Sequence, residues 1–504
     1  MLKRVFVAPD PGRLRLRSAL RAVLGIGSAV ALCGLTGHSL VAAVFGGLAA
    51  LLALFTVLDP TVRGQAVTTA LLPAAGVPVL ALAAVLHDAP LARDAAFLAV
   101  VGAGVYARRW GPRGHSLGVF AFMTYFASQF LHTVPGQLPE LYGAMLLSLL
   151  ASSAVRFGLW CYERRLPPAA PAPPLSGGTG LARPTTRQAV QAMAGGAFAL
   201  AAGQLLSHDR WYWAVGATWW VFVNTASSGE TLVRSFRRVL GTVIGIAVGL
   251  GVAVPLHGAP VPTAALLAVC VFGIFYSAAV SYTWMMLAVT VLAGLLYGLL
   301  GVLDPGLLVL RVAETGVGAL GAVLAVLLVL PVTTHATTDA WIQRALHCVH
   351  ACTAEAAARL AGSGTADPAA RVAELEPLLG RVRASLAPLV HPLSPARARK
   401  QRARRVLALL DDCAREVRGL AAVAADPEAS HDDRLTAACQ RVEAAVAALT
   451  APGTAAGAAR HAVAAPEHAH AAEPALAHLH GLERALAELA VPLRAAGRPP
   501  LIGA

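Results

Sequence analysis

Long apolar stretches dominate the first two thirds of the chain, and their length predicts membrane-spanning helices. An α-helix needs roughly 17–25 mainly apolar residues to cross the hydrocarbon core. The stretches are continuously apolar and do not alternate with period two, which argues against a transmembrane β-barrel. We therefore predict an all-α polytopic membrane region of about twelve spans, near residues 18–36, 38–58, 66–86, 91–107, 115–133, 141–160, 188–206, 211–225, 239–256, 261–280, 284–302 and 307–331.

The polar and flexible segments divide the chain into four predicted parts. A run of prolines followed by SGGTG between the sixth and seventh spans is typical of an exposed linker. After the last span, Ala-rich sequence with Leu and Val every three or four positions predicts soluble helices. The parts are a first six-helix half at 1–165, a cytoplasmic linker at 166–187, a second six-helix half at 188–331 and a cytoplasmic α-helical tail at 332–504.

The two membrane halves resemble each other weakly. His38 and Thr61 in the first half have counterparts in His208 and Thr231, both 170 residues later. We read this as a parallel duplication with a degenerate first half. Such a six-helix duplication is a common way to build a transporter around a site at the middle of the membrane.

Composition and charge agree with a membrane protein and set its expected orientation. The chain is 57% hydrophobic and 13% charged, with a mean hydropathy of +0.64. Its net charge of +13 does not indicate a nucleic-acid partner, because most arginines of the membrane region lie in short loops, where they set topology. Alternate loops hold 18 Lys and Arg on one side and 3 on the other. We predict a bacterial-type inner (plasma) membrane protein with both termini cytoplasmic and the lipid bilayer as its main partner.

Two motifs in the second half carry a family resemblance. An aromatic group at Tyr212-Trp213 is followed by Glu230-Thr231 and Arg234, and then by R-x-x-G-T-x-x-G from Arg238 to Gly245. The last span has Arg311, Glu314-Thr315 and Gly318 in the pattern R-x-x-E-T-x-x-G. These motifs resemble those of the fusaric acid resistance, or aromatic acid exporter, family, which usually has Asp where this chain has Glu314. The resemblance implies a secondary transporter that exports small aromatic carboxylic acids.

The last span holds the sharpest candidates for a substrate and proton site. Arg311 and Glu314 are three residues apart, so their side chains share one helix face. Ionisable groups are costly inside a membrane and usually face a partner or a cavity. Two interpretations stay open: a structural ion pair, or a site where Arg311 binds a substrate carboxylate and Glu314 takes a proton. Asp94 is a weaker proton-relay candidate.

The eighth span contains five aromatic residues with two different expected roles. Trp211, Tyr212 and Trp213 lie at its start, where tryptophan and tyrosine usually anchor a helix at the membrane interface. Trp219 and Trp220 lie deeper, and we expect one of them to line a cavity for an aromatic ring.

The ninth span predicts a helix contact beside a basic membrane edge. Gly241, Gly245 and Gly249 recur every four residues, which with Thr242 makes a smooth stripe for another helix. We expect Gly318 in the last span to serve packing in the same way. Next to the stripe, Glu230, Thr231, Arg234 and Arg238 form a motif at the expected cytoplasmic edge. Its arginines can contact phospholipid headgroups or attract anionic substrates.

The sequence contains none of the common catalytic motifs, and we predict neither an enzyme nor a cofactor or metal site. The leading hypothesis is proton-coupled efflux of a small anionic aromatic substrate or a related toxic compound. The alternative is a membrane scaffold that does not transport and whose helical tail recruits partners. A homo-oligomer is compatible with either.

Overall fold

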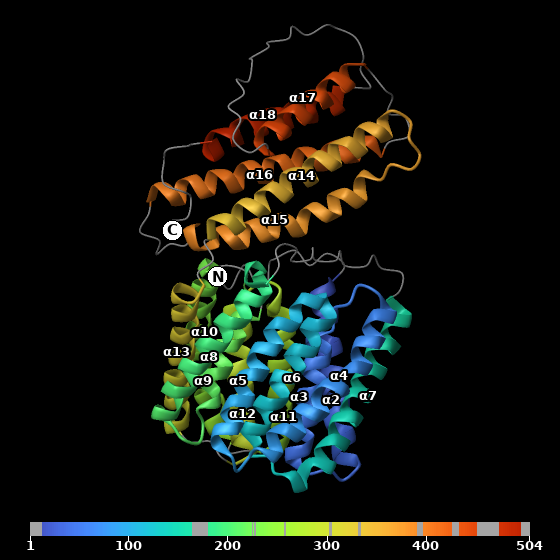
Figure 1. Cartoon of the computed structure of the whole chain (residues 1–504). Helices are drawn as coiled ribbons and strands as arrows, with labels where there is room; N and C mark the ends of the chain where they lie inside the picture. The colour runs from blue at the N-terminus through green and yellow to red at the C-terminus, as the bar shows by residue number, and fades with distance from the viewer. Residues whose placement is uncertain are drawn as a thin grey trace. The chain divides into compact units, whose positions relative to one another are not determined.

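The computed structural model describes residues 13–163, 180–223, 225, 228–256, 259–301, 305–330, 334–390, 397–425, 433–450 and 473–494. Within these ranges the chain forms α-helices and short 3-10 helices, with no strand. They belong to two compact units, one with helices α2 to α13 and one with α14 to α18 (Figure 1). The all-helical class predicted from the apolar stretches is therefore confirmed.

The first unit is a bundle whose helices lie side by side (Figure 1). Its first half contains α2 (Leu14–Leu35), α3 (Leu40–Thr56), α4 (Val62–Val85), α5 (Pro90–Tyr106), α6 (Gly111–Leu131) and α7 (Leu138–Glu163). Its second half contains α8 (Pro184–Leu206), α9 (Tyr212–Phe222), α10 (Ser228–Leu256), α11 (Pro260–Ala278), α12 (Tyr282–Leu299) and α13 (Pro305–Leu328).

Each of these helices overlaps one predicted span. In the described part of the chain, nine helical stretches are long and apolar enough to cross a membrane. One of the nine, Pro90–Leu131, combines α5 and α6, which pack on each other across a turn at Gly111, where φ is +75°. Two helices are shorter: α3 has 17 residues and α9 has 11. The chain is therefore a multi-pass membrane protein, and the count of twelve spans stays a prediction.

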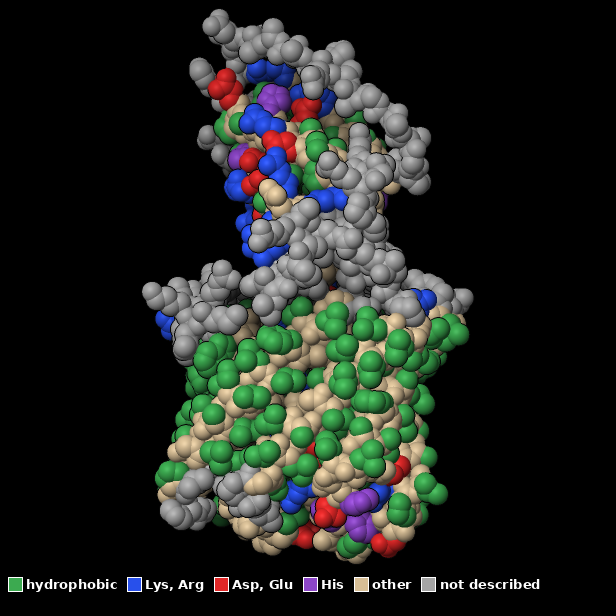
Figure 2. All heavy atoms as spheres, turned by 90° about the vertical axis from the view of Figure 1, so that its left-hand side faces the viewer, with side chains coloured by type: hydrophobic (Ala, Val, Ile, Leu, Met, Phe, Trp, Pro, Cys, Tyr) green, Lys and Arg blue, Asp and Glu red, His purple; other side chains and the backbone are tan. Residues whose placement is uncertain are grey.

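The surface of this unit matches a lipid environment. In Figure 2 hydrophobic side chains cover the visible face of the helices, and acidic, basic and histidine side chains gather at one end of the bundle. Exposed leucines such as Leu24, Leu150 and Leu205 are 56%, 69% and 89% accessible. Such an exposure of apolar side chains is unfavourable in water and ordinary in hydrocarbon.

Local sequence explains where several helices begin. Ser39 precedes α3 and accepts a hydrogen bond from the Ala42 amide, and Thr61 precedes α4 and accepts one from the Gly64 amide. Side-chain oxygens at this position satisfy amides that have no partner within the helix. Helix α8 begins with Pro184, inside the segment predicted as a linker (166–187), and residues 166–179 of that linker lie outside the described ranges.

The helix pairings follow a similar scheme in the two halves. In the first half α2 and α3 pack on α7, and α4 and α5 pack on α6. In the second half α8 and α9 pack on α13, and α10 and α11 pack on α12. Between the halves, α5 packs on α8 and α2 packs on α11.

The second unit consists of α14 (Thr334–Leu360), α15 (Pro368–Val390), α16 (Arg397–Ala424), α17 (Asp433–Thr450) and α18 (Glu473–Arg494). Leu and Val side chains such as Leu346, Val382 and Leu486 form its interior. Ion pairs join neighbouring helices at the surface, among them Arg405 with Glu488 at 2.7 Å and Arg441 with Glu483 at 3.1 Å. Exposed pairs of this kind contribute about 0.2–1 kcal/mol each, so apolar burial is the main stabilising term.

Candidate functional site

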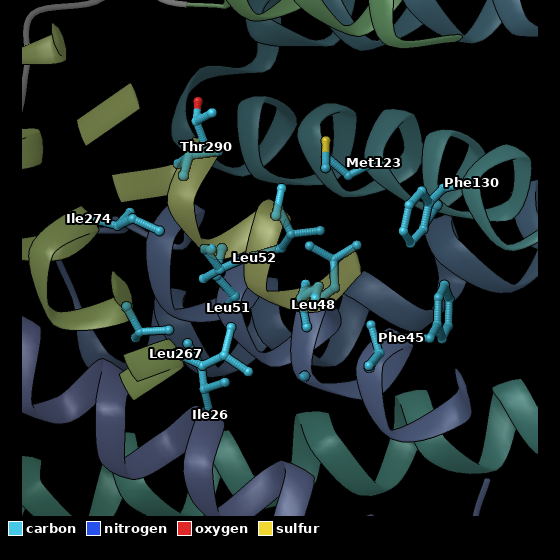
Figure 3. Close-up of a pocket in the computed structure, with 18 of the residues that line it drawn as sticks. Ile26, Phe45, Leu48, Leu51, Leu52, Met123, Phe130, Leu267, Ile274 and Thr290 are labelled. Carbon is cyan, nitrogen blue, oxygen red and sulfur yellow. The ribbon is translucent and has the colours of Figure 1, made fainter. Parts of the chain in front are cut away.

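A cavity of about 530 Å³ lies inside the membrane unit, between its two halves. Helices α2, α3 and α6 of the first half line one side, and α9 to α13 of the second half line the other. Figure 3 shows apolar side chains around this space, including those of Ile26, Phe45, Leu48, Leu51 and Leu52 from α2 and α3. The volume is in the range of ligand pockets, about 300–1,000 Å³.

The polar lining of the cavity comes entirely from the second half. Trp213 and Trp220 also line the cavity. The lining residues other than these two and the polar residues named next are apolar or glycine. The polar lining residues belong to α10, α12 and α13 and are Arg238, Thr242, Thr290, Tyr297, Arg311 and Thr315. The cavity therefore has an apolar wall facing a wall with two cations and several hydroxyl groups, which is suited to an anion with an apolar body.

Arg311 is held against an aromatic ring at the cavity surface. Its guanidinium carbon lies 3.7 Å from the centre of the Trp213 ring, and the residue is 6% exposed. A desolvated contact of this type contributes about 2 kcal/mol. Nε and Nη1 of Arg311 have no hydrogen-bond partner among the described residues. The two donors lie on different edges of the guanidinium, so each can donate a separate charge-assisted hydrogen bond to an anion such as a carboxylate.

Glu314 is buried one helical turn from Arg311. It is 1% exposed and does not line the cavity. Within the described residues the two side chains form no ion pair, and Oε1 of Glu314 accepts no hydrogen bond. Arg311 and Arg210 are the charged groups that act on this carboxyl group. The protonation of a buried carboxyl group depends on a neighbouring positive charge, so it changes when an anion neutralises that charge.

Arg238 reaches the same cavity from α10. It donates a hydrogen bond from Nη1 to the Tyr282 hydroxyl at 3.3 Å and contacts the Met286 sulfur at 3.2 Å. It is among the charged groups that act on Arg311, so both cations influence the same part of the cavity. One turn earlier, the Arg234 guanidinium lies 4.1 Å from the centre of the Tyr282 ring.

Glu230 and Thr231 belong to the same predicted cytoplasmic-edge motif as Arg234 and Arg238. They lie at the start of α10, outside the cavity. Thr231 is buried and Glu230 is partly exposed, and neither lines the cavity. The structure therefore places Arg238 and Arg311 in the same cavity, while Glu230 and Thr231 lie at the start of α10, away from it.

The adjacent tryptophans of α9 point to different surroundings. Trp220 lines the cavity. Trp219 is 1% exposed and stacks on Phe122 of α6 at 3.9 Å between ring centres, with 9° between the planes. Trp219 thus joins two helices in the core and contributes no surface to the cavity.

Asp94 lies away from the cavity, on α5. It accepts a hydrogen bond from Gln204 of α8 at 2.6 Å and pairs with Arg93 at 3.0 Å. These contacts connect the start of α5 to the end of α8.

The small residues of the two motifs lie at close helix contacts. A Cβ atom on Gly241 would be 2.7 Å from the Thr283 carbonyl oxygen, and one on Gly245 would be 2.7 Å from Thr290 Cβ, both on α12. Gly249 has more room, at 3.7 Å from Val291 Cα. In the last helix, a Cβ atom on Gly318 would be 2.6 Å from Ala217 Cβ of α9. Thr242, beside the stripe, lines the cavity.

Several lining residues were not identified by the sequence analysis. Trp213 was interpreted as an interfacial anchor, yet its ring contacts the Arg311 guanidinium at the cavity surface. Tyr297 and Thr315 were not singled out, although Thr315 follows Arg311 by four residues and so shares its helix face. The apolar wall from α2, α3 and α6 had no distinguishing sequence signal, because its residues resemble those of any lipid-facing helix.

Comparison with known proteins supports the resemblance seen in the motifs. The sequence model of the family described as "Fusaric acid resistance protein-like" matches residues 197–325. No curated protein and no solved structure matches the chain. The matched range contains the polar wall of the cavity together with Glu314, and the apolar wall lies outside it.

Proposed function

We propose that this multi-pass membrane protein, whose residues 197–325 match the fusaric acid resistance protein-like family, is an inner-membrane secondary transporter that exports small aromatic carboxylic acids. The family match and the apolar helices support a transporter-like protein. The observation that carries the substrate class is the position of Arg311, a cation with two unpaired donors lying on Trp213 in an otherwise mostly apolar cavity.

In the proposed binding step, the substrate carboxylate meets Arg311 and its ring enters the apolar part of the cavity. Nε or Nη1 of Arg311 donates a hydrogen bond to one carboxylate oxygen, and the positive charge of the guanidinium attracts the group. Trp220 and Phe130 line the same space and offer aromatic faces to a ring. Arg238 adds a second positive charge, which favours an anion over a neutral aromatic compound.

Proton coupling is the second part of the proposal, and it assigns the proton to Glu314. A substrate carboxylate on Arg311 neutralises the cation that favours the ionised form of this acid. Burial then favours the neutral form, so Glu314 takes a proton while substrate is bound. Release of the substrate restores the cation and expels the proton on the same side, so in this scheme proton and substrate move in the same direction. Arg234 and Arg238 are proposed to attract the anion at the cytoplasmic end.

The proposed architecture is two six-helix repeats, twelve spans and cytoplasmic termini. Corresponding helices pair in the same way in the two halves, and the contacts between the halves, α5 with α8 and α11 with α2, correspond to each other. The 18-to-3 distribution of loop Lys and Arg supports the orientation. A cavity between two repeats is where transporters of this kind bind their substrates.

A growth and export assay tests the proposal. Cells that lack the protein are compared with cells that express it, on a panel of hydroxybenzoates and with or without an uncoupler. We expect expression to lower intracellular acid and raise tolerance, and the uncoupler to change the rate of export. Equal accumulation in the two strains for every acid would contradict the proposal.

The scaffold alternative has one observation in its favour, because α14 to α18 form a compact unit of their own. A shortened chain that ends at residue 331 separates the two functions. Export that persists without the tail supports transport by the membrane unit. A phenotype that requires the tail, in a protein that exports no acid of the panel, supports a scaffold.

A further inference from the structure

Helices α2 and α11 contact each other near the start of α2, and residues of both helices line the cavity toward the other end. Near the start of α2, Arg15 donates from Nε to the Tyr276 carbonyl oxygen at 3.0 Å, and its guanidinium lies 4.2 Å from the centre of the Tyr276 ring. Toward the end of α2 and the start of α11, both helices line the cavity. These lining residues are Gly27, Val30, Ala31, Ala264, Leu267 and Ala268, and we refer to them as the α2–α11 opening.

The other contact between the halves, α5 with α8, has a polar link at the corresponding end. There the start of α5 is linked to the end of α8 by the hydrogen bond from Gln204 to Asp94. Gly196 of α8 also lies so close to α5 that an added Cβ would be 3.3 Å from Leu98. None of the residues in the α2–α11 opening can form an equivalent polar link, because all of them are apolar or glycine. The α2–α11 opening therefore lacks the polar link that joins α5 to α8.

Two residues at the α2–α11 opening line the cavity and are also exposed. Val30 lines the cavity and is 41% exposed, and the neighbouring Leu40 of α3 lines it and is 47% exposed. An opening without polar groups is unfavourable for a hydrated ion and favourable for a solute already dissolved in the bilayer. Such a solute reaches the two arginines without crossing an aqueous entrance.

We propose that the cavity also takes amphiphilic carboxylates with an apolar body larger than one aromatic ring, and that they enter from the bilayer through the α2–α11 opening. This rests on the proposed function, since it assumes that the same cavity is the transport site. The head group binds at Arg311 and Arg238. The apolar body lies along the wall formed by Phe45, Leu48 and Leu52 (Figure 3). A cavity of about 530 Å³ has room for a ligand of drug size.

Tryptophan fluorescence provides the binding test. Trp213 and Trp220 line the cavity, and bromine quenches indole emission at short range. The full chain in lipid nanodiscs is titrated with an ω-bromo alkanoate and with the matching ω-bromo alcohol. We expect saturable quenching by the carboxylate and weaker, non-saturable quenching by the alcohol. Each added methylene should tighten the apparent affinity, referred to aqueous ligand, about fourfold.

Tryptophan and arginine variants show whether the quenching arises in the cavity. Trp213→Phe and Trp220→Phe should each remove part of the saturable signal. Trp110→Phe should leave the signal, because Trp110 is 64% exposed and does not line the cavity. Arg311→Gln should weaken the saturable binding of the carboxylate. Equal saturable quenching by acid and alcohol in the unaltered protein would contradict the proposal.

A matched pair of variants on α11 tests the route. Ala264 lines the opening, whereas Ala265 is exposed but does not line the cavity. Ala264→Phe should slow the onset of quenching, and Ala265→Phe should not. Export of hydroxybenzoate should persist in Ala265→Phe. Equal onset rates in the two variants would overturn lateral entry. If hydroxybenzoate is exported but the bromo-carboxylate does not bind, the amphiphile proposal fails while the proposed function stands, and loss of both activities in the unaltered protein overturns both.

Discussion

The contact between α9 and α13 at Gly318 supports the site and gives a sharp prediction. An added Cβ would be 2.6 Å from Ala217 Cβ and closer still to the Ala214 carbonyl oxygen. Carbon atoms in contact prefer about 3.5–4.0 Å, so Gly318→Ala must separate the helices by about 1 Å. Gly316 is the control on the same helix, because a Cβ there would meet nothing within 4 Å.

The expected cost follows from the type of contact. Overpacking costs about 1–3 kcal/mol, and we expect the upper end because a backbone carbonyl group cannot rotate away. The helix-propensity gain from Gly to Ala, up to about 1 kcal/mol, is common to both variants and cancels. Gly318→Ala should therefore be less stable than Gly316→Ala by about 3 kcal/mol.

Denaturant titration of the two purified variants in mixed micelles measures this difference. The separation also moves Trp213 of α9 relative to Arg311 of α13, so Gly318→Ala should bind substrate more weakly than Gly316→Ala. Equal unfolding free energies would show that the helices repack without cost, and the argument from close approach would be wrong.

Three further predictions concern packing, topology and the tail. Gly245→Leu should lower the amount of folded protein in the membrane, whereas Gly251→Leu, where an added Cβ meets nothing within 4 Å, should not; equal abundance by fluorescence-detected gel filtration would exclude the packing role. A reporter fused after Pro331 should be active in the cytoplasm and one at Gly136 should be external, and an external C-terminus would overturn the orientation. In the tail, burial raises the pKa of the Cys413 thiol to about 12, so at pH 8 this group is protonated and should react with iodoacetamide far more slowly than the exposed Cys161; mass spectrometry that finds equal labelling would contradict the burial.

The sequence predicted where the helices lie along the chain better than it predicted which residues of other helices each side chain contacts. Apolar length located most helices of the membrane unit to within a few residues, because that signal depends on the helix alone. The exception is α10, which begins at Ser228, well before the predicted start at residue 239, because its first turns are polar. It could not separate Trp219 from Trp220, since adjacent residues face different directions and the outcome depends on Phe122 of α6. For Trp213 the sequence predicted an anchor at the membrane interface and missed its contact with Arg311 at the cavity surface.

The charged part of the site was predictable for a physical reason that the apolar part lacks. Arg311 and Glu314 stand out because ionisable groups are rare and costly in a membrane span. The wall formed by α2, α3 and α6 consists of residues that serve equally well against lipid or against a cavity. Only the packing of the two halves determines which of these residues face the cavity and which face lipid. Sequence periodicity does not predict that packing.

The most direct test of proton-coupled transport replaces the proposed proton carrier. Purified Glu314→Gln and unaltered protein are placed in liposomes, and transport of hydroxybenzoate is followed with and without an imposed pH gradient. Glutamine keeps the size of the side chain but cannot exchange a proton, so we expect binding to remain and the response to the gradient to disappear. Arg311→Lys, which keeps the charge but loses the planar fork, should weaken binding more than coupling. Transport by Glu314→Gln at the unaltered rate down the pH gradient would show that Glu314 carries no proton and would contradict the proposed mechanism.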